Sequence, residues 1–337
     1  MFGVGKKVFG RILAFTALMA TATVAAPQAH AEDIIDIENS FDSMFGTELR
    51  GPPTYSSPFE AQVASLANAA QGRIGVAAVD LSSGEAIDIL GSQRFPMAST
   101  SKIAVAATFL AGVDAGRWSL SSEFPLLVPV RSAPFSSAKA PVRKGNYLSA
   151  RELIELMITR SSNPATDALL AVVGGPAAVN EWMRQAGITD WSIDRDIATL
   201  VRDDGAVDPA RTIEMRDSAT PLAMVKLLAG LHRGEWLSAS SRSVLLGAMQ
   251  RCRTGTRRIP ALLPASAVVA HKTGSLNNTS SDVGIIDMPD GRSIAVAIYV
   301  TGQGGRPQRE SRIASIAQAI YNGYLVAPSS YSRTAAR

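Results

Sequence analysis

Ser99 and Lys102 place a hydroxyl three positions before an amine, at the start of the apolar stretch 103–112. Residues three apart on a helix share a face, so the two side chains can meet near the first turn. A helix N-terminus favours developing negative charge, and a lysine amine can act as the base for a weak serine nucleophile. The pair predicts acyl transfer through a covalent serine intermediate that needs neither histidine nor metal. The same spacing recurs at Ser136 and Lys139, but in a Pro-flanked polar loop where no helix would hold the two groups together.

Two later runs contain side chains that complement this pair. The run S-S-N at 161–163 lies between two helical patterns, where a turn can direct a hydroxyl and a carboxamide into a cleft. Such a serine can relay a proton to a leaving amine, and the asparagine can bind both a substrate amide and the lysine. The run K-T-G-S at 272–275 follows an apolar strand-like segment. An ammonium and a hydroxyl beside a glycine suit the recognition of a carboxylate.

The elements that must position these runs follow from the periodicity of the apolar residues. Residues 190–218 are charged and weakly periodic, which predicts a long, functional loop. The order of the elements predicts an α+β fold: an antiparallel sheet built from both chain ends and flanked by helices, with an inserted all-helical lobe and the active site between them. Helical patterns cover 58–70, most of 99–186, 221–231, 238–249 and 310–324, and strand-like runs form a hairpin over 73–90 and segments at 267–271, 282–288 and 293–299.

The first 31 residues have the features of a secretory signal peptide. Lys6, Lys7 and Arg11 precede an apolar body at 12–26, and the run A-H-A at 29–31 forms a small-x-small cleavage site. The body is too short and too interrupted to span a bilayer as an uncleaved anchor, and no later segment is long enough. We therefore expect export to the periplasm and no stable membrane insertion after cleavage.

Composition narrows the classes of function further. Removing the three basic residues of the leader from the 33 Lys and Arg leaves 30 against 29 acidic residues, a mature charge of +1, and no basic block indicates nucleic acid. Cys252 is the single cysteine, so no intrachain disulfide can form, and a small buried hydrophobe is its expected role. The mature chain keeps two histidines and has neither H-E-x-x-H nor G-x-S-x-G. We therefore expect no metal, no cofactor and no Ser-His-Asp triad.

Taken together and in this order, S-x-x-K, S-x-N and K-T-G resemble the serine penicillin-recognising enzymes, and the resemblance is closest to class A β-lactamases. It extends to the run R-F-P-M at 94–97, the run R-D-S-A-T-P at 216–221 and the run T-G-T-R-R-I at 254–259. The similarity covers roughly residues 58–325, nearly the whole mature chain. It implies the β-lactamase/transpeptidase-like fold and a small-molecule β-lactam as the substrate.

The resemblance also implies a role for each matching residue. Ser99 would be the nucleophile, Lys102 its activating partner, and Ser161 the group that passes a proton to the β-lactam nitrogen. The backbone N–H groups of Ser99 and Ser275 would form the oxyanion hole. The arginine that the family often supplies from the last strand is replaced by Val283, so another arginine is expected near the substrate carboxylate. The substrate-binding residues implied are Asn163, Lys272, Thr273, Gly274, Ser275 and Arg258.

The deacylating residue is the main departure from the class A pattern. Those enzymes free the acyl-enzyme with a glutamate on a long loop, acting through water. Counting forward from Gly187 puts Ile197 in the place of the glutamate, whereas counting backward from Asp217 puts Asp204 there. An isoleucine cannot abstract a proton, so Asp204 is the candidate base, although it is one methylene shorter than glutamate. Glu214 is a further candidate by its chemistry, although not by its spacing.

Three hypotheses about function are compatible with these observations. The first is a periplasmic, monomeric serine hydrolase that opens β-lactam rings through a Ser99 acyl-enzyme. The second is a D,D-peptidase or esterase-like acyl-hydrolase of cell-wall peptides or esters, and the third is a slow-turnover acyl trap that binds or senses β-lactams. The expected organisation is a signal peptide at 1–31, a flexible lead-in at 32–55, a catalytic domain at 56–328 with its helical lobe at about 99–230, and a C-terminal tail at 329–337.

Overall fold

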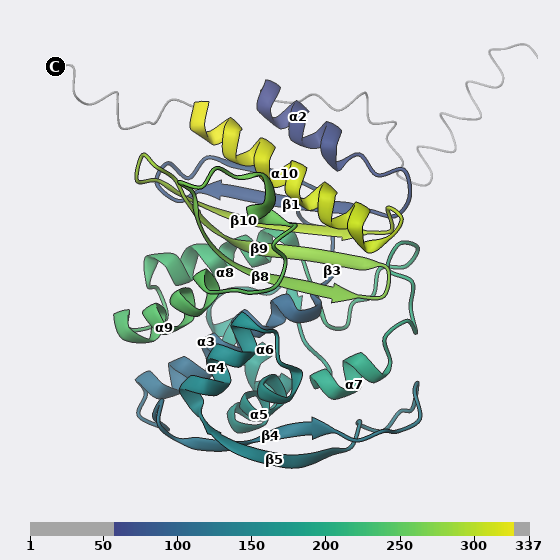
Figure 1. Ribbon diagram of the computed structural model, residues 1–337, viewed down its shortest axis with the longest axis vertical. Helices are drawn as coiled ribbons and strands as arrows, with labels where there is room; N and C mark the ends of the chain where they lie inside the picture. The colour runs from purple at the N-terminus through teal and green to yellow at the C-terminus, as the bar shows by residue number, and fades with distance from the viewer. Residues whose placement is uncertain (1–56, 327–337) are drawn as a thin grey trace, which may run out of the picture. The chain divides into compact units, whose positions relative to one another are not determined.

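The computed structural model describes residues 57–326, and the central feature of this part is a five-stranded antiparallel sheet (Figure 1). The strand order is β2-β1-β10-β9-β8. The first strand pairs with the last, so that Ile74 lies opposite Val300 and Asp80 opposite Ile294. The predicted α+β class, with a sheet built from both chain ends, is thereby confirmed. The strands are β1 (Ile74–Asp80), β2 (Ala86–Ile89), β8 (Val268–Leu276), β9 (Thr279–Asp287) and β10 (Ser293–Thr301).

The chain divides into two units between Thr54 and Tyr55, and the described residues belong to the second unit. The predicted signal peptide, the lead-in and the C-terminal tail lie outside the described residues. Among the helices of the described part, none combines the length and the apolar character that crossing a membrane requires.

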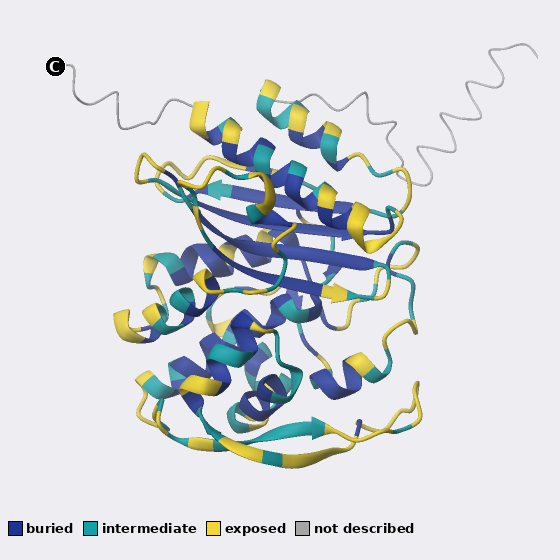
Figure 2. Cartoon of the chain, in the orientation of Figure 1, coloured by how far each residue is buried: buried dark blue, intermediate teal, exposed yellow. Residues whose placement is uncertain are grey.

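Alternating side chains along the strands contribute to two apolar cores, one on each face of the sheet. Val296 and Ile298 of β10 belong to the core that includes residues of α2 (Pro58–Ala67) and α10 (Arg306–Val326). Their neighbours Ala297 and Tyr299 belong to a larger core that extends into the helices of the lobe. Figure 2 shows the strands of the sheet buried between these two layers. The lobe therefore packs against one face of the sheet.

The lobe consists mainly of helices whose ends the sequence marks. Ser149 forms a capping box with Glu152 at the start of α4, and the Ser162 hydroxyl accepts a backbone N–H at the start of α5. Gly174 ends α5 with a φ of 105°, a left-handed conformation that favours glycine. The helices of this part are α3 (Lys102–Asp114), α4 (Ala150–Thr159), α5 (Asn163–Val173), α6 (Pro176–Gln185), α8 (Pro221–Arg233) and α9 (Ala239–Gln250).

The lobe is not entirely helical, and this detail corrects the prediction. Strands β4 (Glu123–Pro129) and β5 (Val142–Ser149) form an antiparallel hairpin that contacts α5. Both strands consist of exposed and half-buried residues, so they lack the clear alternation of apolar and polar residues that marks a half-buried strand. The connection between them contains Ser136 and Lys139, and no helix holds that pair together.

Residues 190–218, which we call the α7 segment, also differ from the prediction of a loop without regular structure. The segment contains the helix α7 (Ile197–Arg202) and begins and ends with the short strands β6 (Trp191–Ser192) and β7 (Ser218–Ala219). These two strands pair with each other, and β7 also pairs with β3 (Phe95–Pro96). Both ends of the segment are therefore fixed beside the stretch that leads to Ser99.

Candidate active site

Ser99 lies in η1 (Ala98–Ser101), a 3-10 turn that contacts β8 and leads into α3. Ala98 has a φ of +49°, an uncommon conformation for a residue with a side chain. The hydroxyls of Thr100 and Ser101 are buried and donate to backbone carbonyls three residues earlier, each at 2.8 Å. Ser99 is partly exposed, so its hydroxyl is the one in this turn that a ligand can reach. Local strain beside a reachable hydroxyl is a common feature of active sites.

Lys102 is fully buried, and its amine is held by two other residues of the predicted site. Its Nζ donates to the Ser161 carbonyl at 2.8 Å and to Asn163 Oδ1 at 2.7 Å, and it lies 3.2 Å from Ser161 Oγ. Burial, followed by the charge of Lys272, holds the pKa of Lys102 well below its usual range, although Asp167 opposes this shift. A lysine with a depressed pKa can be neutral near pH 7, which is the state that can take a proton from a serine.

Ser161 joins all three predicted runs. Its hydroxyl lies 3.2 Å from Lys102 Nζ and accepts from Lys272 Nζ at 3.0 Å. Ser161 has a φ of +57° and immediately precedes Ser162, which caps α5. The cap fixes the start of the helix while the strained residue before it turns its hydroxyl toward the two amines.

The K-T-G-S run lies on β8, next to the turn that holds Ser99. Lys272 is fully buried, and burial lowers its pKa to about 8 even though Cys252 and Asp282 oppose the shift. A Cβ added to Gly274 would lie 2.5 Å from the Met97 carbonyl oxygen, so only glycine lets β8 come this close to η1. Ser275, the last residue of the run, is exposed and accessible to a ligand.

Arg258 donates hydrogen bonds to this strand from a buried position. It is 1% exposed, and its guanidinium donates to the carbonyls of Gly274 and Ser281 at 2.8 and 2.7 Å. One nitrogen also donates to Ser275 Oγ at 2.7 Å, and Glu310 balances the charge at 3.2 Å. Arg258 therefore reaches the predicted carboxylate site through the Ser275 hydroxyl. Val283, which replaces the arginine that the family often supplies, is buried opposite Lys272.

The α7 segment places Ile197 in the same pocket as Asn163. Arg195 forms an ion pair with Asp217 at 2.6 Å, which ties the two ends of the segment together. Ile197 begins α7, and together with Asn163 it lines a pocket of about 300 Å³. Ile197 takes the place of the glutamate when residues are counted forward from Gly187. It thus lies near Asn163, the predicted binding residue for the substrate amide.

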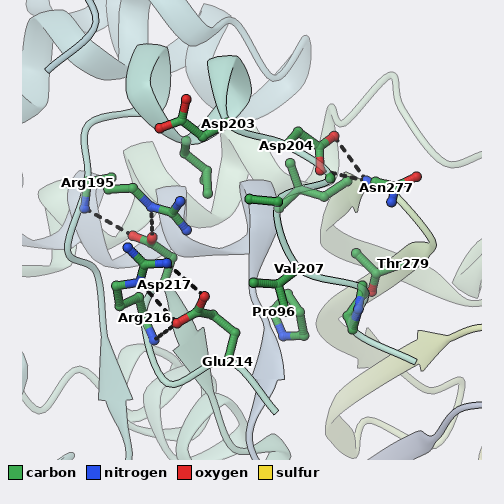
Figure 3. Close-up of a pocket in the computed structure, with 15 residues that line it drawn as sticks. Pro96, Arg195, Asp203, Asp204, Val207, Glu214, Arg216, Asp217, Asn277 and Thr279 are labelled. Atoms are coloured by element: carbon green, nitrogen blue, oxygen red, sulfur yellow. Dashed lines mark hydrogen bonds and ion pairs between the residues drawn. The ribbon is translucent and has the colours of Figure 1, made fainter. Parts of the chain in front are cut away.

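Asp204 lies beyond the end of α7 and is exposed. Its carboxylate accepts the backbone N–H of Asn277 at 2.9 Å. Asp204 and Glu214 both line a cavity of about 60 Å³. Figure 3 shows the residues around it, where Glu214 forms an ion pair with Arg216 at 2.9 Å. Within the described part, no hydrogen bond joins either carboxylate to Ser99 or Lys102. The role of Asp204 as the deacylating base therefore stays a prediction.

Asp167 is an active-site carboxylate that the sequence reasoning missed. It is buried on α5, where its two oxygens accept the backbone N–H groups of Ile197 and Ala198 at 2.7 and 2.9 Å. Burial raises its pKa to about 6, although those two hydrogen bonds oppose the shift. Its spacing of four residues from Asn163 was the available signal, since residues four apart share a helix face.

These contacts are suited to one class of chemistry. A partly exposed serine, a buried lysine of lowered pKa and a second serine between two lysines form a site for covalent acyl transfer. In the described residues, no group of three or more His, Cys, Asp and Glu side chains could hold a metal ion.

The comparisons with known proteins identify the family. Residues 58–324 match the model described as the Beta-lactamase enzyme family, and the chain belongs to this family. It is 29% identical over 272 residues to the extended-spectrum beta-lactamase PER-1 of Pseudomonas aeruginosa, which covers 77% of this chain and 85% of that protein. It is 30% identical over 283 residues to the beta-lactamase CTX-M-8 of Citrobacter amalonaticus, covering 82% and 93% of the two chains.

Solved structures agree with this assignment. A beta-lactamase from Chitinophaga pinensis has a TM-score of 0.70 and 30% identity, covering 80% of this chain and 100% of the other. A variant of the reconstructed last common ancestor of class A beta-lactamases of Gram-negative bacteria has a TM-score of 0.68 and 31% identity, covering 80% and 99%. The predicted resemblance to class A serine β-lactamases is confirmed.

Proposed function

We propose that this protein hydrolyses β-lactams through an acyl-enzyme on Ser99. The observation that carries the proposal is the position of Ser161 Oγ, 3.2 Å from Lys102 Nζ and 3.0 Å from Lys272 Nζ. This arrangement offers a base for the nucleophile, a proton relay and a cation for the substrate carboxylate within one site. The relatives named as beta-lactamases support the choice of substrate.

In the proposed acylation step each of these groups has one role. Neutral Lys102 takes the proton of the Ser99 hydroxyl, and the serine oxygen attacks the lactam carbonyl. The backbone N–H groups of Ser99 and Ser275 stabilise the oxyanion, a contribution typically worth about 10²- to 10³-fold in rate per donor. As the ring C–N bond breaks, Ser161 passes a proton to the nitrogen. Lys272, Thr273 and Ser275 hold the carboxylate, with Arg258 positioning the Ser275 hydroxyl, and Asn163 binds the substrate amide.

Deacylation is the step that this site supports least. Asp204 is the proposed base for the attacking water, and its contact with the Asn277 N–H leaves lone pairs that can accept a proton from water. Ile197, however, contributes an apolar side chain beside Asn163. This observation favours a second candidate function, in which the protein forms the acyl-enzyme readily and releases it slowly.

We further propose that the protein acts in the periplasm. The signal-like sequence at 1–31 supports export to the periplasm, with no membrane insertion after cleavage, and a small β-lactam is the only partner that the site suggests. We propose a monomer, and β-lactam resistance as the consequence of expression in a Gram-negative cell.

Intact-mass spectrometry with a penicillin tests the proposed function. The wild type should open many rings per chain through a transient adduct, and Ser99→Ala should abolish both adduct and turnover. Ser136→Ala, which changes the other S-x-x-K serine, should behave as the wild type. A stable adduct of one molecule per chain would establish the acyl trap instead. No adduct, together with cleavage of a D-alanyl peptide or ester, would reject β-lactam hydrolysis in favour of a peptidase or esterase.

A further inference from the structure

The hairpin of β4 and β5 carries positive charge that its own side chains do not balance. Residues 124–149, which we call the hairpin segment, contain four basic residues and no acidic residue: Arg131, Lys139, Arg143 and Lys144. All four are exposed, and in the described part of the chain none of them forms an ion pair. The rest of the mature chain, which includes Glu123 at the start of β4, holds 26 basic against 29 acidic residues, a charge of −3. Positive charge is therefore concentrated on the hairpin segment.

Exposed apolar side chains lie among these cations. Phe135 is 63% exposed and Tyr147 is 57% exposed, and Val130 and Val142 are also exposed. Figure 2 shows that β5 and the connection before it are mostly exposed. The hairpin segment thus combines aromatic rings and unpaired cations on a surface open to solvent.

Tyr147 faces away from the core of the lobe. Phe124 and Leu148 are cross-strand partners, and both pack against that core. The next pair along the strands, Pro125 and Tyr147, lies on the opposite face because successive side chains of a strand alternate. β5 pairs with β4 alone among the described strands, so its outer edge has no partner strand.

Phe135 is fixed in its exposed position by the α7 segment. Its φ is +57°, an outlier for a bulky side chain. Its backbone N–H donates to Asp203 Oδ1 at 2.8 Å, and Arg202 donates to the Ser136 carbonyl at 2.9 Å. Arg202 and Asp203 pair with each other, so their charges are balanced. Backbone strain of this kind clusters at positions that contact ligands, and here it fixes an apolar ring in water.

Protection of an edge strand explains only part of this pattern. Lys and Arg on an exposed edge discourage pairing with other chains, and Arg143 and Lys144 fit that role. It does not explain why Phe135 and Tyr147 are exposed beside them, because large exposed apolar side chains promote association. Aromatic rings together with Lys and Arg suit an anionic lipid surface, where the rings enter the headgroup layer and the cations attract the lipid charge.

We propose that the hairpin segment docks this protein reversibly on an anionic lipid surface. The four cations contact the lipid phosphates, and Phe135 and Tyr147 enter the headgroup region. Docking of this kind is peripheral and needs no membrane-spanning helix, and none occurs in the described part of the chain. A few cations and two rings give weak, salt-dependent binding, so the protein is concentrated at the membrane without being anchored in it.

Sedimentation with lipid vesicles tests the docking. The protein is purified as the cell produces it, and all variants share the same N-terminus. It should bind vesicles of phosphatidylglycerol and not vesicles of phosphatidylcholine, and the binding should weaken as salt is added. Absence of binding to phosphatidylglycerol would overturn the proposal and leave edge protection as the role of the cations. Because no substrate is present, the result stands whether or not the protein opens β-lactams.

A matched pair of double variants locates the binding surface. Arg143→Gln combined with Lys144→Gln should weaken binding to phosphatidylglycerol by about 25-fold, since each cation near an anionic surface contributes about fivefold. Arg184→Gln combined with Arg233→Gln removes the same charge from α6 and α8, where both arginines are exposed and paired with glutamates. This control should change binding by less than about threefold. Equal losses in the two double variants, with circular dichroism showing both folded, would reject the hairpin segment as the docking surface.

Phe135→Ser distinguishes a lipid surface from an acidic macromolecule. It should lower binding to phosphatidylglycerol vesicles roughly tenfold, because the ring no longer leaves water, whereas Phe135→Leu should keep most of the binding. Binding to polyglutamate, a soluble polyanion, should be weaker than binding to the vesicles and should not respond to Phe135→Ser. Equally tight binding to polyglutamate, with no effect of Phe135→Ser on either ligand, would reject the lipid surface and assign the hairpin segment to an acidic macromolecule.

Discussion

At the scale of single residues, the hydroxyl of Ser161 links the two lysines of the candidate active site. Two buried amines from different elements approach it, Lys102 of α3 and Lys272 of β8. A hydroxyl can accept from one group while it donates to another, so a proton can cross between the lobe and the sheet without movement of the backbone. The positive φ of Ser161 is a conformational cost that the surrounding contacts offset.

Asp204→Asn tests the proposed base at this scale. If Asp204 activates the deacylating water, the acyl-enzyme should accumulate and steady-state turnover should fall by about 10²-fold or more, because an amide cannot take the proton. Rapid quenching followed by intact-mass analysis measures the adduct. Asp203→Asn, one residue away, is the control and should keep normal turnover. Unchanged turnover in Asp204→Asn would assign deacylation to another group.

Arg258 and Arg257 form a matched pair for a second test. Arg258→Ala should raise KM for a penicillin roughly tenfold with a smaller effect on kcat, because Ser275 loses the donor that positions its hydroxyl. The side chain of Arg257 is 75% exposed and contacts only Glu310 among the ion pairs described, so Arg257→Ala should leave KM within about twofold. Thermal melting confirms that both variants are folded at the assay temperature. Equal KM values for the two variants would reject a role for Arg258 in substrate binding.

At the scale of elements, Asp167 fastens α7 to α5. A carboxylate offers two oxygens, and here each accepts one backbone N–H from the start of α7. Asp196 caps the same helix through the N–H of Thr199 at 2.8 Å. The position of Ile197 beside Asn163 is therefore determined by two carboxylates and not by the helix propensity of a six-residue segment.

Asp167 should also give folding stability a pH dependence. Its pKa rises from 3.8 to about 6 on folding, so the folded state holds the proton more tightly than the unfolded chain. Stability should consequently fall as the pH rises from about 4 to about 6, with the full cost present above pH 6. Asp167→Asn cannot ionise and should lack this component, although it loses one acceptor and should be less stable by about 1–3 kcal/mol at low pH.

Melting temperatures from pH 3.5 to 7 measure the effect of Asp167. The difference between wild type and Asp167→Asn should shrink as the pH rises through the window. Asp203, whose pKa is lowered to about 2 mainly by the hydrogen bond from Arg202, provides the contrast, and Asp203→Asn should run parallel to the wild type above about pH 5. A constant difference for Asp167→Asn would contradict the assigned ionisation.

The elements that could be predicted are those with a strong internal pattern. The continuous apolar run of β10 and the capping box of α4 are local properties, and both elements occur where the pattern indicated them. The helix α7 depends on Asp167, which is distant in the sequence, and its local signal is limited to the cap at Asp196 on a six-residue segment. The hairpin of β4 and β5 was missed because its residues are half-buried or exposed. The identities of Ser99, Lys102 and Lys272 follow from motifs, whereas the contacts of Arg258 required the fold.

At the scale of the whole described part, the two apolar cores explain why the site is where it is. One core packs the sheet against α2 and α10, and the other joins it to the lobe. Predicting both lobes needed only the order of elements along the chain, since runs of helices between strands imply an insertion. The family resemblance implied that Ser99 and Ser275 lie close together, but the contact at Gly274 that brings β8 to η1 required the fold.

The pairing of β1 with β10 has a consequence for how the protein is made. During synthesis β1 emerges early, but its partner strand is among the last parts of the described chain to appear. Joining two segments so far apart requires the closure of a long loop, which is slow and cannot begin until β10 is available. A chain cut short before β10 would therefore leave β1 with an open, apolar edge, and such edges pair with other chains. Prematurely terminated copies should aggregate and should not fold into a smaller active protein.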